Sequence, residues 1–511
     1  MTTSTPTPRP RRWLVSAIAV PLLAIAALSS WAFASPIGAG ADDDFHLSSI
    51  WCGGLEAENL CEPAAAADER EVSRDLFRNA HCYFGQPAVS ASCQGEYLGD
   101  DLTEDVQATD RGNFAGLYPP VYYFAMSAFA GDNLQISALT MRVATSVLFV
   151  GMVTAIFFLL PVRRRLTLVL SIIATIVPLG MFYIPSNNPS SWALISAGTL
   201  WMALLGYFEA TGKRRVLLGA IAVMATVMGA GARADAAIYS GVAVVAVVAL
   251  TATRTRAYLL SLILPAALGV LALIALVSAG QTGAASTGLS DTSGREQHPV
   301  VGLIANNILQ LPHLLAGSFG SWPLGWLDTT LPAIVAFGAS LAFIVAVTVG
   351  LRSPNRRKTW VSIGVLGLFL LVPSYILLRS NAFVGTEVQP RYILPLLILL
   401  TGIVLLQSPQ RELRLSQAQA LVIVVALAAA NSVALHTNIR RYVTGLDAQS
   451  GNLDNAAEWW WTIPISPMTM WFIGSASFGL MLLALARVWL KTQRPEPIDR
   501  AITSKWEPIS V

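Results

Sequence analysis

The sequence predicts an all-α integral membrane protein with about twelve transmembrane helices. Of its 511 residues, 54% are hydrophobic and only 12% are charged, whereas a soluble domain carries about 25% charged residues. A membrane-spanning helix needs about 20 mostly apolar residues, and runs of that kind recur along almost the whole chain. The charge is therefore too sparse to cover a water-facing surface, and the apolar runs account for most of the length.

The apolar runs divide the chain into a bundle and its connections. The expected transmembrane helices lie at 13–35, 136–160, 166–184, 192–209, 216–232, 235–252, 257–278, 331–350, 360–378, 392–406, 418–435 and 467–490. The helices at 216–232 and 235–252 are short, and we expect them to be tilted or broken. The remaining parts are a cytoplasmic N-terminus, a first loop, two further outer loops and a cytoplasmic tail, expected at 1–12, 36–135, 279–330, 436–466 and 491–511.

Basic residues lie in every second connection. Lys and Arg gather in the cytoplasmic loops of membrane proteins, so this alternation predicts an even number of spans with both ends of the chain in the cytoplasm of a bacterial plasma membrane. The basic connections contain Arg9 to Arg12, Arg163 to Arg165, Lys213 to Arg215, Arg254 and Arg256, Arg352 to Lys358, Arg411 and Arg414, and Arg487 to Lys505. A cleavable signal peptide ending at Ala32-Phe33-Ala34 is the alternative for the first span, and it leaves the remaining topology unchanged.

The first outer loop is acidic and contains every cysteine of the chain. It carries 17 of the 30 Asp and Glu residues, together with Cys52, Cys61, Cys82 and Cys93. An oxidising exterior favours disulfides, and the simplest of three connectivities joins Cys52 to Cys61 and Cys82 to Cys93. A zinc site is the competing interpretation, but the loop has no C-x-x-C pair.

An acidic motif follows directly after the first span, as Asp42-Asp43-Asp44-Phe45-His46. Three adjacent carboxylates favour a bound cation, a raised pKa in one of them, or simple hydration. A carboxylate at the membrane surface is well placed to take a proton from an attacking hydroxyl of a membrane-bound substrate. A hydrated acidic loop without a catalytic role explains the motif equally well.

Charged residues near helix ends form the other candidate sites. Arg142 lies inside the second span, where a cation needs a partner such as a lipid phosphate or an aspartate. Arg233 and Asp235 lie between two spans, where a charged pair could line a wet cavity. Arg391, at the outer end of the tenth span, has the bidentate geometry that grips phosphate. Each also has a plain interpretation as an interfacial anchor or an internal ion pair.

The remaining outer segments are aromatic and amide-rich. Tyr118-Pro119-Pro120-Val121-Tyr122-Tyr123 leads into the second span, and Asn188-Pro189 forms a turn whose amides could meet sugar hydroxyls or cap a helix. We expect the segment 298–331, with Trp326 and Asp328, to lie along the outer interface. The Trp459 to Trp461 run is expected to be an interfacial belt, with a sugar-stacking platform as the alternative.

Several function classes are disfavoured by what the sequence lacks. It contains no P-loop, so an ATP-driven pump is not expected, and it has no evident internal repeat of the kind found in many secondary transporters. Its basic and acidic totals, 33 and 30, are too balanced to indicate nucleic-acid binding.

The motifs taken together resemble the GT-C superfamily of membrane glycosyltransferases. Within it the chain is similar to an uncharacterised bacterial multi-spanning family with a D-[DE]-x-x-H motif after the first span, although Asp43 replaces the commoner Glu. The matching motifs are Asp42 to His46, Pro119 to Tyr123, Asn188-Pro189, Gly325-Trp326-Leu327-Asp328-Thr329 and Arg391-Tyr392-Ile393-Leu394-Pro395.

The resemblance implies a GT-C-like fold and an inverting transferase that moves a hexosyl or pentosyl group from a polyprenyl-phosphate donor to a cell-envelope glycan or glycolipid on the outer face. Asp43 or Asp42 would act as base, and Arg391, or Arg233 as second choice, would stabilise the phosphate. The expected substrate-binding residues are His46, Arg391, Arg233, Asp235, Tyr122, Asn188, Trp326 and Asp328.

Some alternatives remain open at this stage. A divalent metal held by Asp42, Asp44 and His46 is a second option for charge stabilisation. A lipid-linked glycan flippase, a secondary transporter and a non-catalytic envelope assembly protein are the competing functions.

Overall fold

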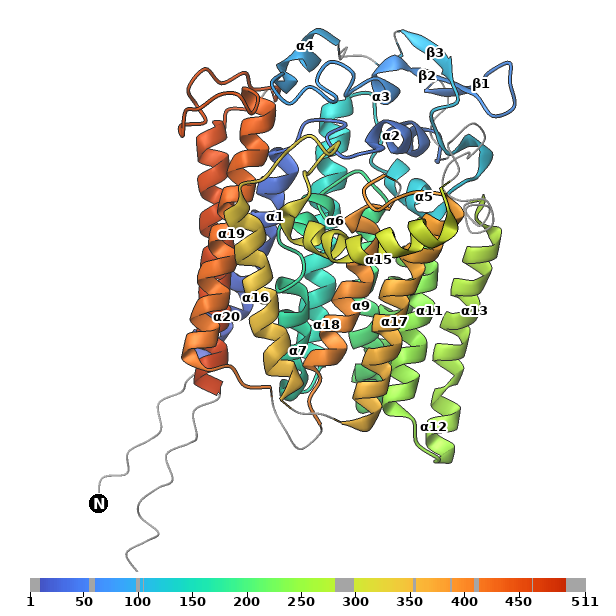
Figure 1. The fold of residues 1–511 in the computed structure, drawn as a ribbon, viewed down its shortest axis with the longest axis vertical. Helices are drawn as coiled ribbons and strands as arrows, with labels where there is room; N and C mark the ends of the chain where they lie inside the picture. Colours follow the sequence, from blue (N-terminus) through green and yellow to red (C-terminus); the bar gives the residue numbers. More distant parts are fainter. Residues whose placement is uncertain are drawn as a thin grey trace, which may run out of the picture.

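The fold is a bundle of long helices, capped at one end by a small domain (Figure 1). The structure is a computed structural model that describes residues 10–54, 60–97, 102–103, 105–280, 298–352, 355–386, 388–408, 413–461 and 463–492. Within them, eleven helices are long and apolar enough to cross a membrane. The expected class, an all-α membrane protein, is confirmed.

The helices of the bundle have side chains suited to two environments. Apolar side chains on outward faces remain exposed, including Val245, Val277 and Phe337 at 69%, 67% and 71%, as expected of surfaces that meet lipid. The helices are α1 (Pro10–Phe33), α6 (Leu134–Leu159), α7 (Val162–Ile173), α8 (Leu179–Tyr183), α9 (Ser190–Glu209), α10 (Gly212–Ala232), α11 (Ala234–Thr251), α12 (Arg256–Ser261), α13 (Ile263–Ser278), α15 (Val300–Ala316), α16 (Ala333–Leu351), α17 (Arg356–Arg379), α18 (Pro390–Leu405), α19 (Gln417–Val443) and α20 (Pro467–Thr492).

The expected helix break lies elsewhere in the chain than the sequence indicated. Helices α10 and α11 are continuous, with 21 and 18 residues, so neither is broken as expected. The break falls instead in the third expected span, 166–184, where α7 ends and α8 begins only at Leu179. Pro178 precedes α8 and has no backbone N–H with which to continue α7.

Two further segments differ from a simple reading of hydropathy. Helix α15 meets the length and composition criteria for a span, yet it runs across the long axis of the bundle, in front of α17 and α18 (Figure 1). This orientation agrees with the expected interfacial course of 298–331. Helix α19 continues to Val443, so the first eight residues of the expected outer loop 436–466 are helical.

The two ends of the bundle differ in chemistry. We call the end with the small domain the disulfide end. The opposite end, where α1 begins and α20 ends (Figure 1), is called the arginine-rich end, because it carries Arg163 to Arg165, Lys213 to Arg215, Arg254, Arg256 and Arg356 to Lys358. The expected basic residues Arg9, Arg411 and Arg494 to Lys505 lie outside the described residues.

The small domain consists of short elements joined by disulfides. Bonds link Cys52 to Cys61 and Cys82 to Cys93, which is the simplest pairing expected from the sequence and leaves no cysteine for a zinc site. Strands β1, β2 and β3 pair antiparallel in that order. The elements are α2 (Asp43–Trp51), β1 (Cys61–Pro63), β2 (Arg70–Ser73), α3 (Arg74–Phe77), η1 (Ala91–Cys93), α4 (Gln94–Tyr97), β3 (Val106–Thr109), η2 (Asn113–Ala115) and α5 (Val121–Ser127).

Candidate functional site

The backbone that leads from α1 to the acidic motif is held by side chains from distant parts of the chain. A buried loop must find hydrogen-bond partners for its peptide groups, and here the carbonyls of residues 32–39 and 41 all accept bonds from side chains. We call this segment, residues 32–41, the spine. Its donors are Arg142, Trp461, Asn438, Tyr83, Gln94, Trp326, Tyr442, Asn188 and Arg391.

Arg142, on α6, is the main donor to the start of the spine. Its guanidinium is buried and donates to the carbonyl oxygens of Ala32, Ser35 and Pro36 at 3.1, 2.6 and 2.9 Å. Its Nε donates to Asn187 Oδ1 at 2.7 Å. The sequence suggested a lipid phosphate or an aspartate as its hydrogen-bond partner. The hydrogen bonds go instead to neutral acceptors, which engage four of the five N–H groups, whereas the favourable charge interaction of Arg142 is with an aspartate, Asp43.

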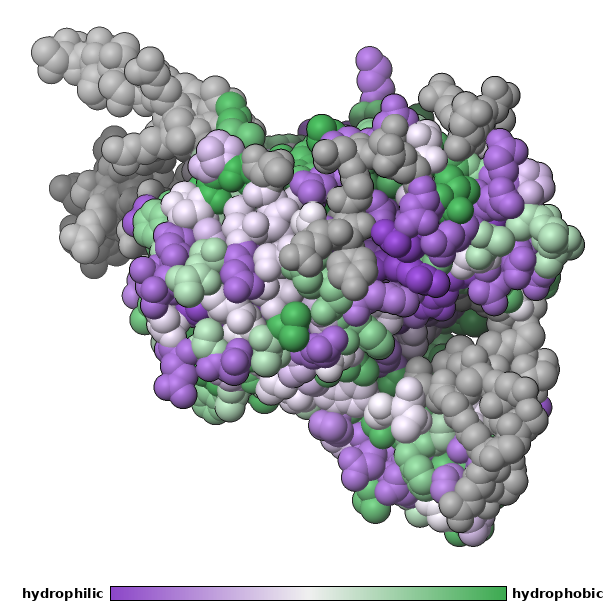
Figure 2. Space-filling view, turned by 90° about the horizontal axis from the view of Figure 1, so that it is seen from above, coloured by the Kyte–Doolittle hydropathy of each residue, from purple (hydrophilic) through white to green (hydrophobic). Residues whose placement is uncertain are grey.

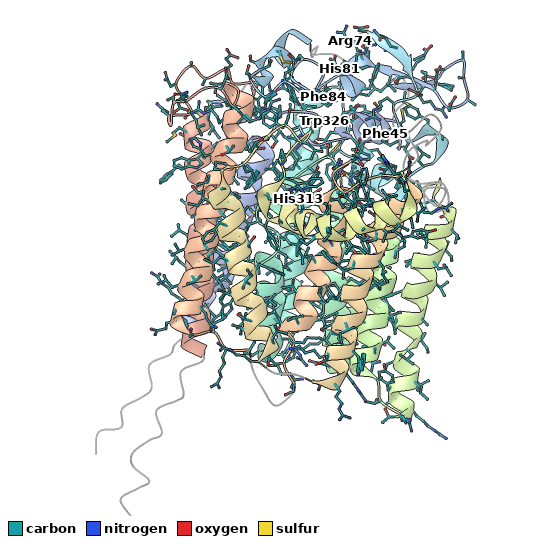
Figure 3. The ribbon with its side chains drawn as sticks, viewed as in Figure 1. Phe45, Arg74, His81, Phe84, His313 and Trp326 are labelled. Carbon is teal, nitrogen blue, oxygen red and sulfur yellow. A yellow bond between two sulfur atoms is a disulfide. The ribbon has the colours of Figure 1, made fainter. Side chains whose placement is uncertain are left out.

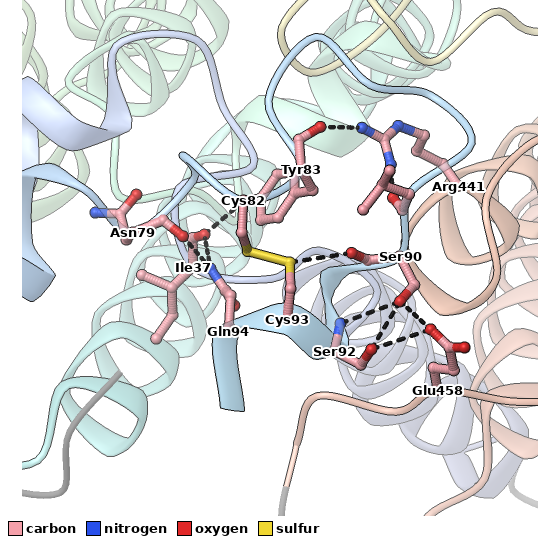
Figure 4. Close-up of a disulfide and its surroundings, with 11 residues drawn as sticks. Ile37, Asn79, Cys82, Tyr83, Ser90, Ser92, Cys93, Gln94, Arg441 and Glu458 are labelled. Atoms are coloured by element: carbon pink, nitrogen blue, oxygen red, sulfur yellow. Dashed lines mark hydrogen bonds between the residues drawn. A yellow bond between two sulfur atoms is a disulfide. The ribbon is translucent and has the colours of Figure 1, made fainter. Parts of the chain in front are cut away.

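The disulfide-bonded loop holds the middle of the spine. Tyr83 Oη and Gln94 Nε2 both donate to the carbonyl of Ile37, each at 2.7 Å, from either side of the Cys82–Cys93 bond (Figure 4). The bond brings these two donors to the same peptide group. The small domain therefore acts on the membrane bundle through the backbone just before the acidic motif.

Trp326 and Asp328 belong to this scaffold. Trp326 Nε1 donates to the carbonyl of Gly38 at 2.8 Å, and its ring packs edge-on against Phe84, 4.6 Å between centroids, beneath the disulfide loop (Figure 3). Asp328 accepts from Arg441 at 2.8 Å, with both side chains largely buried. Through these contacts both residues help to position the spine; their expected role in substrate binding stays a prediction.

Helix α2 carries the acidic motif and begins at its second aspartate. Asp42 precedes the helix with a φ of 68°, a left-handed conformation that Asp tolerates better than most residues. Asp43, Asp44, Phe45 and His46 form the first turn, and Phe45 lies inside the domain, below its strands in Figure 3. The three carboxylates consequently point into three different environments.

Asp42 makes an ion pair with Arg391 at the N-terminus of α18. Arg391 Nη2 donates to Asp42 Oδ2 at 2.7 Å, and the Asp42 side chain remains 38% exposed. Arg391 Nη1 donates to the carbonyl of Ala41 at 2.9 Å. Burial raises the pKa of Asp42, but the charge and hydrogen bond of Arg391, together with the charge of Arg111, outweigh that effect and hold the pKa below its ordinary value. Asp42 is therefore anionic and partly open to solvent.

Asp43 has the opposite environment. Its side chain is 1% exposed, and its Oδ2 accepts from the backbone N–H of Gly40 at 2.9 Å. Burial raises its pKa to about 6, although Arg142, Gly40 and Asn188 each lower it. The raised pKa that the sequence allowed for one of the three carboxylates thus belongs to Asp43.

The remaining motif residues leave no room for the metal that the sequence allowed. Asp44 receives two bonds from Arg111, at 2.7 and 3.0 Å, and His46 Nδ1 lies 2.9 Å from Tyr123 Oη. Burial lowers the pKa of His46 well below its ordinary value, so the imidazole is neutral at pH 7. No cluster of His, Cys, Asp and Glu in the described residues suits a metal ion. Asp42, Asp44 and His46 do not fit a shared ion, because each is engaged elsewhere.

Arg233 and Asp235 form a second ion pair close to the first. Arg233 Nε and Nη2 donate to the two oxygens of Asp235 at 2.8 and 2.9 Å. The guanidinium lies over the rings of Tyr118 and Tyr392, at 5.8 and 4.9 Å. Tyr392 Oη in turn contacts Arg391 Nη2 at 3.0 Å. The tyrosine therefore connects the two arginines, and both expected phosphate-binding candidates belong to one cluster.

Tyr122 and Asn188 lie deeper, around Asp43. Asn188 Nδ2 donates to the carbonyl of Ala41 at 3.0 Å, and its side chain lies beside the Asp43 carboxylate. Tyr122 is fully buried, close to Asp43 and Ser191. Both side chains therefore support the motif from below, and the structure does not place them on an accessible surface.

The accessible part of the site is a group of charged side chains at the disulfide end. We call Asp42, Arg111, Arg233, Asp235 and Arg391 the charged cluster. Asp42, Arg111 and Asp235 have side chains exposed by 38%, 41% and 25%, whereas both other arginines are buried. Seen from this end, hydrophilic residues are interspersed with apolar ones, and the surface is hollowed on one side (Figure 2). The cluster thus joins an open carboxylate to two buried cations.

Several residues of the site escaped the sequence analysis. Arg111 lies in the acidic first outer loop and was not singled out, and Arg441 resembled a residue of an exposed outer loop. Trp461 is 4% exposed and donates to the carbonyl of Phe33 at 2.7 Å, so it is neither an interfacial belt nor a sugar platform. For Arg111 and Arg441 the sequence did offer a signal, because each is an arginine in acidic or apolar surroundings.

Comparison with known proteins identifies the family. A family model for predicted membrane proteins, DUF2142, matches residues 7–400. These residues include the spine, the acidic motif and the whole charged cluster. No curated protein and no solved structure matches the chain. The matched region covers well over half of the 511 residues, and the chain therefore belongs to the DUF2142 family of membrane proteins.

Proposed function

We propose that this protein is an inverting membrane glycosyltransferase of the GT-C type, which uses a polyprenyl-phosphate sugar as donor and an envelope glycan or glycolipid as acceptor. The observation that carries the proposal is the Asp42–Arg391 pair, 2.7 Å between Oδ2 and Nη2. It combines an exposed carboxylate with a buried guanidinium at one membrane surface. Transfer from a lipid phosphate requires these two groups, one for the acceptor proton and one for the leaving group.

The proposed step uses the ion pair as a switch. The donor phosphate takes the place of Asp42 on Arg391, because a guanidinium binds phosphate oxygens in the same forked geometry. Asp42 then loses the largest of the charge interactions that lower its pKa, and becomes a stronger base. The acceptor is activated only once the donor is in place.

The bonds change in one displacement at the anomeric carbon. The acceptor hydroxyl gives its proton to Asp42 as its oxygen forms a bond to that carbon. The bond between the carbon and the phosphate oxygen breaks, and the electron pair remains on the phosphate. Arg391 stabilises the added negative charge, with Arg233 linked to it through Tyr392. Inversion follows because attack and departure occur on opposite faces.

The structure supports Asp42 over Asp43 as the base. A general base must lie within hydrogen-bond reach of the proton that it takes, and Asp43 is 1% exposed behind the spine. Asp43 instead accepts from Gly40 and fixes the turn from which Asp42 projects. The exterior disulfides favour the disulfide end as the outer face, with the arginine-rich end in the cytoplasm.

Transport is less well supported than transfer. A transport path through the membrane would need charged groups that face it, and the candidates are Arg142, Arg233 and Asp235. Arg233 and Asp235 bond to each other, and Arg142 is also engaged. Its four hydrogen bonds to the spine and Asn187 occupy it inside the protein. An envelope assembly role predicts that the charged cluster is dispensable, which the following experiment also tests.

The test is a transfer assay in lipid nanodiscs, with radiolabelled polyprenyl-phosphate sugars and crude envelope acceptor. Asp42→Asn removes the base and leaves an amide of equal size, so we expect a loss of about 100-fold or more. Arg391→Lys keeps the charge but not the fork, and should also impair transfer. Asp132→Asn, an exposed carboxylate at the same end, is the matched control and should behave as wild type.

Two results would overturn the proposal. Turnover by Asp42→Asn at the wild-type rate would remove the base from the mechanism. Absence of transfer and of donor hydrolysis with every sugar tested, by a folded protein that binds the lipid, would favour transport or assembly.

A further inference from the structure

One cavity of the described structure lies between the membrane-spanning helices, far from the charged cluster. It has a volume of about 390 Å³, within the range of ligand pockets. Its walls are formed by α1, α6, α7 and α20, with Leu413 at the edge. Apart from two arginines, the lining is almost wholly apolar, so water is an unsuitable occupant. The hydrocarbon chains of lipids surround these helices and are the suitable occupant.

The cavity is as deep as one leaflet. Along α1 it extends from Ser16 to Leu28, which corresponds to about 18 Å at 1.5 Å per residue. Half of a hydrocarbon core measures about 15 Å. One end of the cavity lies at the arginine-rich end, where Ser16, Val162 and Trp489 line it, and we take this end as its mouth. A chain that enters from that leaflet would reach approximately the middle of the membrane.

Positive charge surrounds the mouth. Arg163 and Arg165 line the cavity itself. Arg163 and Arg164 share one carboxylate, Glu209. Arg165 bonds to the carbonyl of Leu160 and lies 5.0 Å from the Phe157 ring, without a carboxylate partner among the described residues. Three arginines against one glutamate leave a net positive site next to an apolar slot.

We propose that this cavity binds an anionic glycerophospholipid of the leaflet at the arginine-rich end, with its phosphate at Arg163 and Arg165 and one acyl chain between α1, α6, α7 and α20. Basic pockets between transmembrane helices bind anionic lipid head groups in this way. The bound chain fills the space between α1 and α7 and supports the packing of the first helix, from which the spine continues.

The glycosyl donor is a poor occupant for this cavity. From Ser16 to Phe33, α1 spans about 26 Å, and the charged cluster lies beyond its far end. One phosphate cannot contact both Arg165 and Arg391. The phospholipid site is therefore separate from the proposed donor site, and it does not rest on the proposed function.

Native mass spectrometry of the full chain can test the site. Protein from nanodiscs of equal phosphatidylglycerol and phosphatidylcholine is expected to retain phosphatidylglycerol. The double variant Arg163→Gln/Arg165→Gln should bind it on the order of 30-fold more weakly, since each basic residue near the surface contributes roughly fivefold. Arg356→Gln, which removes an exposed arginine at the same end, should bind as wild type.

A second variant tests the apolar slot independently of charge. Ala24→Phe places a ring in the cavity wall and should abolish retention, whereas Val245→Phe adds the same ring on an exposed face of α11 and should not. Each variant is checked for folding by circular dichroism. Equal retention by all variants would overturn the site. Equal binding of phosphatidylcholine, or displacement by added polyprenyl phosphate, would overturn the assignment of its occupant.

Discussion

The two adjacent aspartates should change stability with pH in opposite directions. Asp43 has a pKa of about 6 in the folded protein, against an ordinary value of 3.8. Between these values the folded state binds more protons than the unfolded state, so the Asp43 contribution to stability falls as pH rises and levels off above about pH 6. The variant Asp43→Asn removes this dependence, because Asn cannot ionise. Its side-chain oxygen still accepts from the N–H of Gly40.

The size of the effect follows from the shift. A difference of about two pKa units corresponds to about 3 kcal/mol. With an unfolding entropy of about 2 cal/mol/K per residue and 511 residues, the midpoint should move by about 3 °C. Asp43→Asn is therefore expected to melt about 3 °C above wild type at pH 7, and at the same temperature as wild type near pH 4.

Asp42→Asn provides the control with the opposite sign. The pKa of Asp42 is lowered, with Arg391 as the strongest favourable charge, so its contribution is present above pH 3.8 and is lost as pH falls through the folded pKa. This variant should melt below wild type at pH 7. Thermal unfolding of both variants from pH 4 to 8, in one detergent, gives the differences. A pH-independent gap for Asp43→Asn would refute the inferred burial of a carboxylate with a raised pKa.

Three further changes test the spine and its supports. Arg142→Met should destabilise the protein by roughly 3 to 5 kcal/mol, because it leaves buried acceptors unpaired; an unchanged melting temperature would contradict the hydrogen bonds to Ala32, Ser35 and Pro36. Trp326→Phe removes the bond to Gly38 and part of the ring that packs against Phe84, and should cost at least about 1 kcal/mol. Transfer should fall more steeply, because the motif is displaced, and a rate assay beside the melting curve would show the difference. Cys82→Ser/Cys93→Ser should cost roughly 3 kcal/mol and make the loop sensitive to limited proteolysis. A loop that stays resistant to the protease would show that the bond has no structural role.

The sequence was informative where one physical pattern dominates. Hydropathy located most spans because lipid accepts only long apolar helices, and the close spacing of Cys82 and Cys93 indicated their bond. Arg391 was chosen for its position at a helix end, and the structure brings it to Asp42 across 349 positions. A pattern of residue types was sufficient for each of these features.

The remaining features depend on tertiary contacts that a single sequence does not reveal. Arg441 is polar and follows a long apolar run, which is typical of a loop, yet α19 continues through it because Asp328 and the carbonyls of Tyr83 and Val89 accept its bonds. Trp326 and Asp328 were assigned to a substrate for the same reason: a polar or aromatic residue in an outer loop has the same appearance whether its partner is a ligand or a peptide group.

The difference between Asp42 and Asp43 shows how the scaffold and the chemistry are connected. In a row of three carboxylates the sequence could not choose a base, since identical side chains have identical intrinsic pKa values. The spine separates the two carboxylates. The backbone N–H of Gly40 donates to Asp43 and holds it in the interior. The left-handed turn at Asp42 places the Asp42 carboxylate between Arg391 and the solvent. Environments that drive the pKa values of neighbouring acids apart distinguish their roles in enzymes. Because the spine depends on donors from α6, the turn before α9, α18, α19 and the disulfide loop, a defect in any of them should first disturb the position of Asp42, before the bundle itself unfolds.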